Sequence, residues 1–261
     1  MMKDDARAAE AAAFLWRAHR ARETYRNLPA DLQPRSLDEA YAAQEAFHAL
    51  AAPSRGEVAG LKIATTTKVM QDLMGIDHPC GGAIFAATIH DGPARLACTD
   101  FVNLRIECEI AIRLGADLPA DGAPYTAESV RPAVAALMPA FELIEDRRAD
   151  YKATEAFSLI ADNCWSAGVV LGVPQPLRAD LDPGALRGRL AINGRTVGEG
   201  AADGPLAALA WLATLVAKRG RPMRRDMVVM TGSLVPTASI APGDTAIFTV
   251  DGLGAVKLDL S

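Results

Sequence analysis

Two glutamates stand in a run whose alternate residues are apolar, Leu104-Arg105-Ile106-Glu107-Cys108-Glu109-Ile110-Ala111-Ile112. In a β-strand successive side chains point to opposite faces, so Glu107 and Glu109 project together while Cys108 packs on the other side. Like charges held side by side disfavour ionisation unless a proton or a cation is shared, and hard divalent cations prefer carboxylate oxygen. The segment therefore predicts half of a magnesium or manganese site. The alternative is a solvent-facing strand whose glutamates pair with neighbouring arginines.

A third carboxylate that could complete the site is Glu142, which is embedded in the apolar stretch Pro139–Ile144. An acid in such surroundings is a candidate for a functional site, although a strand residue that faces water is the alternative. Lys62 lies in the β-like run Val58–Ile63, where burial would destabilise its charge and nearby carboxylates would restore it. Such a lysine could donate to a substrate carboxylate or carry a proton, or it could simply cover the sheet with its alkyl stem.

Four further polar residues could contact a substrate, and three of them also have a structural interpretation. Asp162 and Asn163 could orient water or substrate, or they could form a turn, which Asx residues favour. Ser233 could donate its hydroxyl group to a substrate carboxylate. Arg147 could pair with a second carboxylate on a substrate, or with the acidic residues that precede it.

Local patterns predict the elements that position these residues. High helix propensity from about Asp5 to Tyr25 and a capping-box spacing at Ser36–Glu39 predict two helices, the second ending near Ala51 before Pro53. From Glu57 onward the chain changes to short strands and turns. We therefore divide it into a helical N-terminal lobe, residues 1–56, and a β-rich catalytic domain, residues 57–261.

Within the second part, three further helices are predicted, over residues 67–74, 126–136 and 205–219. Predicted strands cover residues 58–63, 104–114, 138–145, 228–230, 245–250 and 255–260. A β-hairpin is predicted over residues 190–197, because Asn193-Gly194 supplies the positive φ that a tight turn requires. The fold class is α+β.

Composition argues against several classes of function. The 261 residues carry a formal net charge of −5 and no run rich in lysine and arginine, which argues against nucleic acid as a partner. The four cysteines form no Cys-x-x-Cys pair and no zinc-like cluster with the four histidines. No apolar run approaches the roughly 20 residues that span a bilayer, and the first residues lack the pattern of a signal peptide. We expect a cytoplasmic protein with no membrane partner.

Several segments together resemble the 2-keto-4-pentenoate hydratases and 4-oxalocrotonate decarboxylases of the fumarylacetoacetate hydrolase superfamily. The resemblance depends on the order of Gly60-Leu61-Lys62-Ile63, the Glu-x-Glu strand, Pro139–Ile144 with Asp146-Arg147, Ala161-Asp162-Asn163, Thr231-Gly232-Ser233 and Pro242-Gly243-Asp244. It covers nearly the whole chain. It implies a fumarylacetoacetate-hydrolase-like mixed β-roll with a small helical N-terminal lobe.

The resemblance also implies a ligand set. A Mg²⁺ or Mn²⁺ ion would be held by Glu107, Glu109 and Glu142, and Lys62 would be the active-site lysine. Asp162 joins Lys62 as a catalytic candidate, and the candidates for substrate binding are Asn163, Ser233 and Arg147. The substrate would be a small 2-oxo acid or its enol, whose carboxylate and keto oxygen such an ion can chelate.

The implied reaction is metal-dependent addition of water to a 2-hydroxy-2,4-dienoate, a 2-keto-4-pentenoate-like compound from aromatic or amino-acid catabolism, through a metal-stabilised enolate. The alternatives are decarboxylation of the 4-oxalocrotonate type and carbon–carbon hydrolysis of an acylpyruvate. Hydrolysis usually needs a His–Glu pair, and neither His78 nor His90 lies in a convincing one. An accessory subunit and a binding protein for 2-oxo acids are non-catalytic alternatives. We expect a homo-oligomer, with a decarboxylase or hydratase of the family as a further potential partner.

The chain departs from the family pattern at three places. Cys108 stands between the two glutamates where many relatives have proline, and it should face away from the metal. Cys80 stands where an acid is usual, and Thr65-Thr66-Thr67 replaces a glycine-containing continuation of the lysine strand. Because the last two lie near the presumed pocket, they bear on the identity of the substrate more than on the metal.

Overall fold

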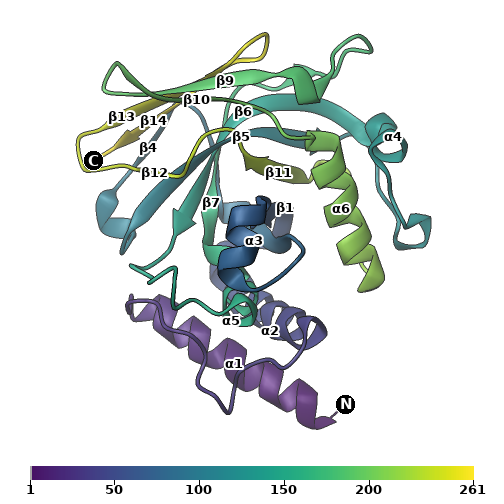
Figure 1. Ribbon diagram of the computed structural model, residues 1–261, viewed down its shortest axis with the longest axis vertical. Coiled ribbons are helices and arrows are strands. Elements are labelled where there is room, and N and C mark those ends of the chain that lie inside the picture. The colour runs from purple at the N-terminus through teal and green to yellow at the C-terminus, as the bar shows by residue number, and fades with distance from the viewer. Residues whose placement is uncertain (1) are drawn as a thin grey trace.

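The computed structural model describes residues 2–261 and contains two mixed β-sheets, and the first two helices lie together at the N-terminal end (Figure 1). The helices are α1 Met2–Arg20, α2 Leu37–Arg55, α3 Lys68–Met74, α4 Ala127–Val130, α5 Ala156–Ala161 and α6 Pro205–Lys218. The strands are β1 Val58–Ala64, β2 Cys80–Phe85, β3 Ile89–Asp91, β4 Ala94–Leu96, β5 Leu104–Leu114, β6 Val134–Glu145, β7 Ser166–Leu171, β8 Gln175–Pro176, β9 Arg187–Ile192, β10 Arg195–Ala201, β11 Val228–Ser233, β12 Ala238–Ser239, β13 Thr245–Val250 and β14 Gly254–Leu260. The predicted α+β class is confirmed.

The larger sheet brings together segments that lie far apart in the sequence. Its strand order is β2-β1-β11-β5-β6-β7-β3, with β12 added to β5 and β8 added to β6. The long antiparallel ladder between β5 and β6 places Glu107 directly opposite Glu142. Strand β11 pairs with β5 on one edge and with β1 on the other, so Lys62 lies opposite Met230. The candidate lysine and carboxylates therefore share one region of one sheet.

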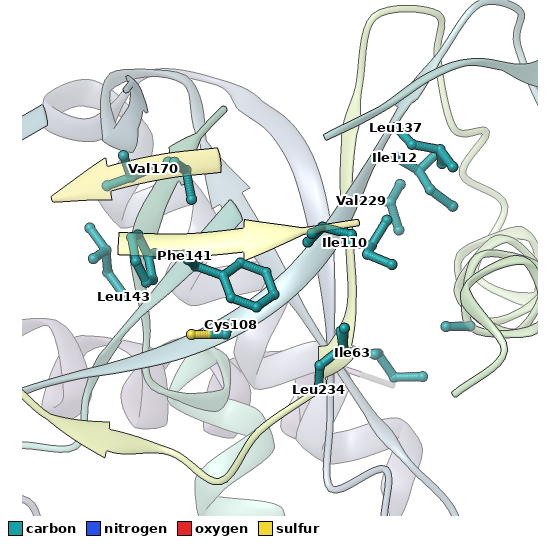
Figure 2. Packing of buried hydrophobic residues seen from close by; sticks show 14 of the residues in the cluster. Ile63, Cys108, Ile110, Ile112, Leu137, Phe141, Leu143, Val170, Val229 and Leu234 are labelled. Atoms are coloured by element: carbon teal, nitrogen blue, oxygen red, sulfur yellow. The ribbon is translucent and has the colours of Figure 1, made fainter. Parts of the chain in front are cut away.

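The smaller sheet, in the order β10-β9-β13-β14-β4, packs against the larger one. The ring centroids of Phe141 on β6 and Phe248 on β13 lie 6.3 Å apart across this interface. Figure 2 shows Cys108 and Ile110 of β5 beside Phe141 in the same core. Because strand side chains alternate, filling the core with these residues directs the intervening glutamates to the opposite face.

Helices α1 and α2 lie at the end of the molecule away from the smaller sheet (Figure 1). Ser36 caps α2 by accepting a hydrogen bond from the Glu39 backbone at 3.2 Å, as its spacing predicts. The helix continues through Pro53 to Arg55, four residues beyond the predicted end. The helices share a buried cluster with β2 and α5. The division at residue 57 stays a prediction.

The predicted helix over residues 126–136 is wrong beyond its first turns. Helix α4 ends at Val130, a short 3₁₀ turn follows over residues 131–133, and β6 begins at Val134. Pro132 disfavours a continuing helix, and the segment after it is taken up by pairing with β5. The predicted helix over residues 67–74 is confirmed as α3, which Thr67 caps and which ends at Gly75, where φ is 67°. The Asn193-Gly194 turn is confirmed as well.

No helix in the described part of the chain has both the length and the apolar character needed to cross a membrane.

Candidate metal centre and substrate cleft

Three carboxylates from the two central strands converge on one point. Glu107, Glu109 and Glu142 each offer an oxygen, and these oxygens lie within 4.8 Å of one another. The arrangement follows from the ladder, since Glu107 faces Glu142 across the strands and Glu109 is its next neighbour on the same face of β5. Glu109 and Glu142 are fully buried, whereas Glu107 is half-buried and borders a cleft.

Some of the carboxylate oxygens have protein partners and others do not. The Gly232 backbone N–H donates to Glu109 Oε2 at 2.8 Å, and the Thr237 hydroxyl donates to Glu107 Oε1 at 2.5 Å. Lys62 Nζ lies 2.8 Å from Glu142 Oε1. Among the described residues, Glu109 Oε1 and Glu142 Oε2 are buried and have no hydrogen-bond partner. Because unpartnered buried carboxylate oxygens are costly, a divalent cation bound between them fits this donor set.

The pKa values of the carboxylates and of Lys62 show that the cluster holds more negative than positive charge. Burial raises the pKa of Glu142 to about 7, even though Lys62 acts in the opposite direction. Burial, together with Glu142 and Glu107, also holds the pKa of Glu109 well above its usual range. Burial opposes the charge on Lys62, but the neighbouring Glu142 outweighs it, so the pKa of the lysine is raised. The lysine is therefore a protonated hydrogen-bond donor. Without a bound cation, the buried carboxylates favour their protonated forms.

A cleft of about 470 Å³ opens beside the carboxylates. Lys62 and Glu107 line it, together with the end of β11 and the loop after it, residues 232–237. Ser233 also lines the cleft, and its hydroxyl donates to the Val235 carbonyl at 2.7 Å and accepts from the Cys108 backbone at 3.1 Å. Ser233 thus ties the loop to β5. Thr237 was not identified from the sequence, because a single threonine in a loop carries no spacing signal.

Arg147 and Asp162 form a buried ion pair outside the residues that line the cleft. Arg147 Nη2 donates to Asp162 Oδ2 at 2.5 Å, and His19 Nε2 from α1 lies 2.6 Å from Oδ1. Burial disfavours the charge on Asp162, but His19 and Arg147 outweigh it, so the pKa of the carboxyl is lowered. Both carboxylate oxygens of Asp162 are therefore occupied by protein groups.

Asn163 also lies behind the cleft wall. Its side chain accepts from the Ala83 backbone N–H at 2.7 Å, donates to the Ala83 carbonyl at 2.9 Å, and lies 2.8 Å from His48 Nε2. Asn163, Cys164 and Trp165 have consecutive positive φ angles of 55°, 49° and 56°, a conformation that costs energy for non-glycine residues. The hydrogen bonds of Asn163 anchor this turn, which places Cys164 and Trp165 in the cleft wall.

Comparison with known proteins identifies the family. The family model described as fumarylacetoacetate (FAA) hydrolase C-terminal matches residues 82–260. A 2-keto-4-pentenoate hydratase of Burkholderia vietnamiensis is 33% identical over 98% of both chains. A 2-keto-4-pentenoate hydratase of Paraburkholderia phymatum is 31% identical over the full length of both.

Among solved structures, the 4-oxalocrotonate decarboxylase of Pseudomonas putida G7, complexed with magnesium and adipate, superposes with a TM-score of 0.88. The two chains are 25% identical and 97% of each is covered. The expected fumarylacetoacetate-hydrolase-like fold is confirmed. The chain belongs to the fumarylacetoacetate hydrolase family and groups there with the 2-keto-4-pentenoate hydratases.

Proposed function

We propose that this enzyme is a hydro-lyase that adds water to a 2-hydroxy-2,4-dienoate and depends on Mg²⁺ or Mn²⁺. The observation that carries the proposal is the cluster of Glu107, Glu109 and Glu142, with two buried oxygens unpartnered, at the edge of a cleft that also contains Lys62. The full-length similarity to hydratases supports the reaction type. The magnesium complex of the structural neighbour supports the class of cation.

Glu107, Glu109 and Glu142 would hold the divalent cation, which would supply a Lewis acid that stabilises negative charge developing on the substrate. Lys62 supplies the second positive charge at the same place. Its protonated Nζ is fixed by Glu142, so it can donate a hydrogen bond to substrate oxygen without reorganising. Thr237 holds Glu107 in orientation through its hydroxyl group. The buried floor of the cleft keeps these charges in a low-dielectric setting where they act strongly.

The remaining candidates are proposed to act through other residues. Asp162 and Arg147 fix the segment before and after α5 by their ion pair. Asn163 fixes the strained turn that carries Trp165. Ser233 fixes the loop between β11 and Thr237. Each of these is a positioning residue in this proposal.

Product analysis tests the reaction type. The enzyme with excess Mg²⁺ is incubated with 2-hydroxypenta-2,4-dienoate, and separately with oxalocrotonate, and the products are weighed by mass spectrometry. A gain of one water by the dienoate supports the proposal. Loss of carbon dioxide from oxalocrotonate with no hydration of the dienoate would assign the chain to the decarboxylases instead. Glu109→Gln should abolish turnover, while the exposed Glu199→Gln on β10 should leave it unchanged.

We also propose that the enzyme forms a homo-oligomer in the cytoplasm. The outer side of α3 supports self-association, because Val69 and Leu73 lie one turn apart and are 77% and 41% exposed. Sedimentation velocity tests this, with dissociation expected for Val69→Glu if α3 forms the contact. Association with a decarboxylase or hydratase partner is proposed from the family resemblance alone.

A further inference from the structure

The cleft has an apolar wall that includes Ile144, two residues along β6 from Glu142. Six side chains from α3, β6, α5 and the turns beside them form it, and all of them belong to one hydrophobic cluster. We call this the apolar wall: Met70, Met74, Ile144, Tyr151, Leu159 and Trp165. Tyr151 and Trp165 meet edge to face with ring centroids 5.1 Å apart, so the wall is firmly packed.

The described residues that line this cleft provide one cationic side chain, Lys62. Its Nζ is already 2.8 Å from Glu142 at the carboxylate end. The hydroxyl of Tyr151 donates to Asp146 Oδ2 at 3.0 Å, so the polar group that Tyr151 brings to the wall is already paired with a buried carboxylate. The indole N–H of Trp165 is buried without a hydrogen-bond partner among the described residues, but it is a neutral donor and cannot balance a negative charge.

Arg147, the arginine expected to accept a second substrate carboxylate, is not available to this wall. Its guanidinium pairs with Asp162 and it is 2% exposed. A substrate with a carboxylate at its distal end would therefore bury that charge against apolar surface without a counter-ion. Such burial is strongly unfavourable.

The size of the cleft adds a second constraint. A volume of about 470 Å³ lies within the range of pockets that enclose drug-sized ligands, roughly 300–1,000 Å³. A five-carbon acid held at the carboxylate end would leave the apolar wall in contact with water. An apolar extension on the distal carbon would displace that water and gain the hydrophobic contribution of burial.

We propose that this enzyme, given the hydratase reaction proposed above, is specific for 2-hydroxy-2,4-dienoates that carry an uncharged alkyl or aryl group on the distal carbon. The apolar wall receives that group. A distal carboxylate is excluded by the absence of a counter-ion among the described lining residues. Specificity then resides in the wall, while the glutamates and Lys62 bind the part common to all such substrates.

The test compares kcat/KM of the Mg²⁺-loaded enzyme for dienoates whose distal carbon bears hydrogen, methyl, propyl or carboxylate. Dienoate absorbance gives the rate, and product mass confirms addition of water. We expect kcat/KM to rise about fourfold per methylene added, since each buried methylene contributes about 0.8 kcal/mol. We expect the carboxylate compound to react at least about 100-fold more slowly than the propyl compound.

A matched pair of variants on α3 locates the effect. Met70 lies in the wall, whereas Asp72 of the same helix does not line the cleft and its side chain is 62% exposed. Met70→Lys should lower the propyl-to-carboxylate preference by about tenfold, since it adds a cation to the wall. Asp72→Lys should leave the preference unchanged.

Three results would overturn this inference: equal kcat/KM for hydrogen, methyl and propyl compounds, a preference for the carboxylate compound, or equal effects of the two α3 variants. These differ from failure of the proposed function, in which even the unsubstituted dienoate gains no water. Far-ultraviolet circular dichroism spectra that match that of the parent enzyme show that both variants are folded.

Discussion

Protons and the divalent cation should compete for the same buried carboxylates. Burial holds the pKa of Glu142 at about 7 in the metal-free protein, against an ordinary value of 4.5, and the pKa of Glu109 is raised as well. A cation binds the ionised forms, so every proton that it displaces weakens its apparent affinity. Lowering the pH from about 8 to about 5 should therefore reduce the stabilisation that Mg²⁺ confers on the fold.

The magnitude follows from the pKa of Glu142. Below pH 7 one competing proton lowers the apparent affinity about tenfold per pH unit, which is about 100-fold at pH 5. This corresponds to roughly 2.7 kcal/mol less metal-dependent stabilisation under conditions in which the site is saturated at high pH. Protonation of Glu109 makes the dependence steeper.

Without metal the sign is reversed. The folded pKa of Glu142 lies above its unfolded value, so the folded state binds the extra proton between about pH 4.5 and 7. The contribution of this group to stability therefore falls as the pH rises through that window. Added Mg²⁺ should abolish the fall, because it replaces the proton as the partner of the carboxylates.

Urea unfolding followed by tryptophan fluorescence measures both effects. Each pH requires one series with excess Mg²⁺ and one with a chelator, and the quantity of interest is their difference in free energy of unfolding. The difference removes the contribution of His48, whose pKa burial lowers to about 4, because it is present in both series. In the control variant Glu199→Gln, the metal-dependent difference should change with pH as it does in the parent enzyme. Glu109→Gln should reduce both that pH dependence and the stabilisation by Mg²⁺.

A difference between the two series that stays constant from about pH 5 to pH 8 would refute the competition. It would mean that Mg²⁺ binds elsewhere, or that the carboxylates are ionised throughout.

Three substitutions extend the account. Lys62→Met should lower kcat about 100-fold or more and should affect Mn²⁺ affinity, measured by calorimetry, less strongly. An unchanged kcat would show that the lysine takes no part in the reaction. The control is Lys68→Met, because Lys68 is exposed. Asn163→Ala should lower the free energy of unfolding in urea by about 2 kcal/mol or more, because it leaves backbone groups of Ala83 without partners. An unchanged free energy of unfolding would show that the turn does not depend on these hydrogen bonds. Thr237→Val should weaken Mn²⁺ binding about tenfold, since Glu107 loses the hydroxyl that orients it, and an unchanged affinity would contradict that role.

The metal cluster was predictable because strand periodicity is a local property. Alternation alone placed Glu107 and Glu109 on one face, and the apolar flanks of Glu142 indicated a buried strand. Their direct pairing was not predictable from periodicity, because register depends on which strands become neighbours. The resemblance to a family supplied the ligand set that the residues alone left open.

The roles of Asp162, Asn163 and Arg147 were harder to predict. Their residue types suit substrate contact and structural pairing equally well, and the choice depends on α1 and α2. His19 and His48, from those helices, reach Asp162 and Asn163 over sequence separations of more than 100 residues. Likewise, the segment after Pro132 had a helical pattern but became part of β6, because pairing with β5 overrides local propensity.

Anomalous scattering from crystals soaked in Mn²⁺ tests the central claim most directly. We expect one strong manganese site within about 2.0–2.4 Å of an oxygen from each of Glu107, Glu109 and Glu142, next to Lys62. Manganese bound at any other place, with the three carboxylates left without a cation, would contradict it.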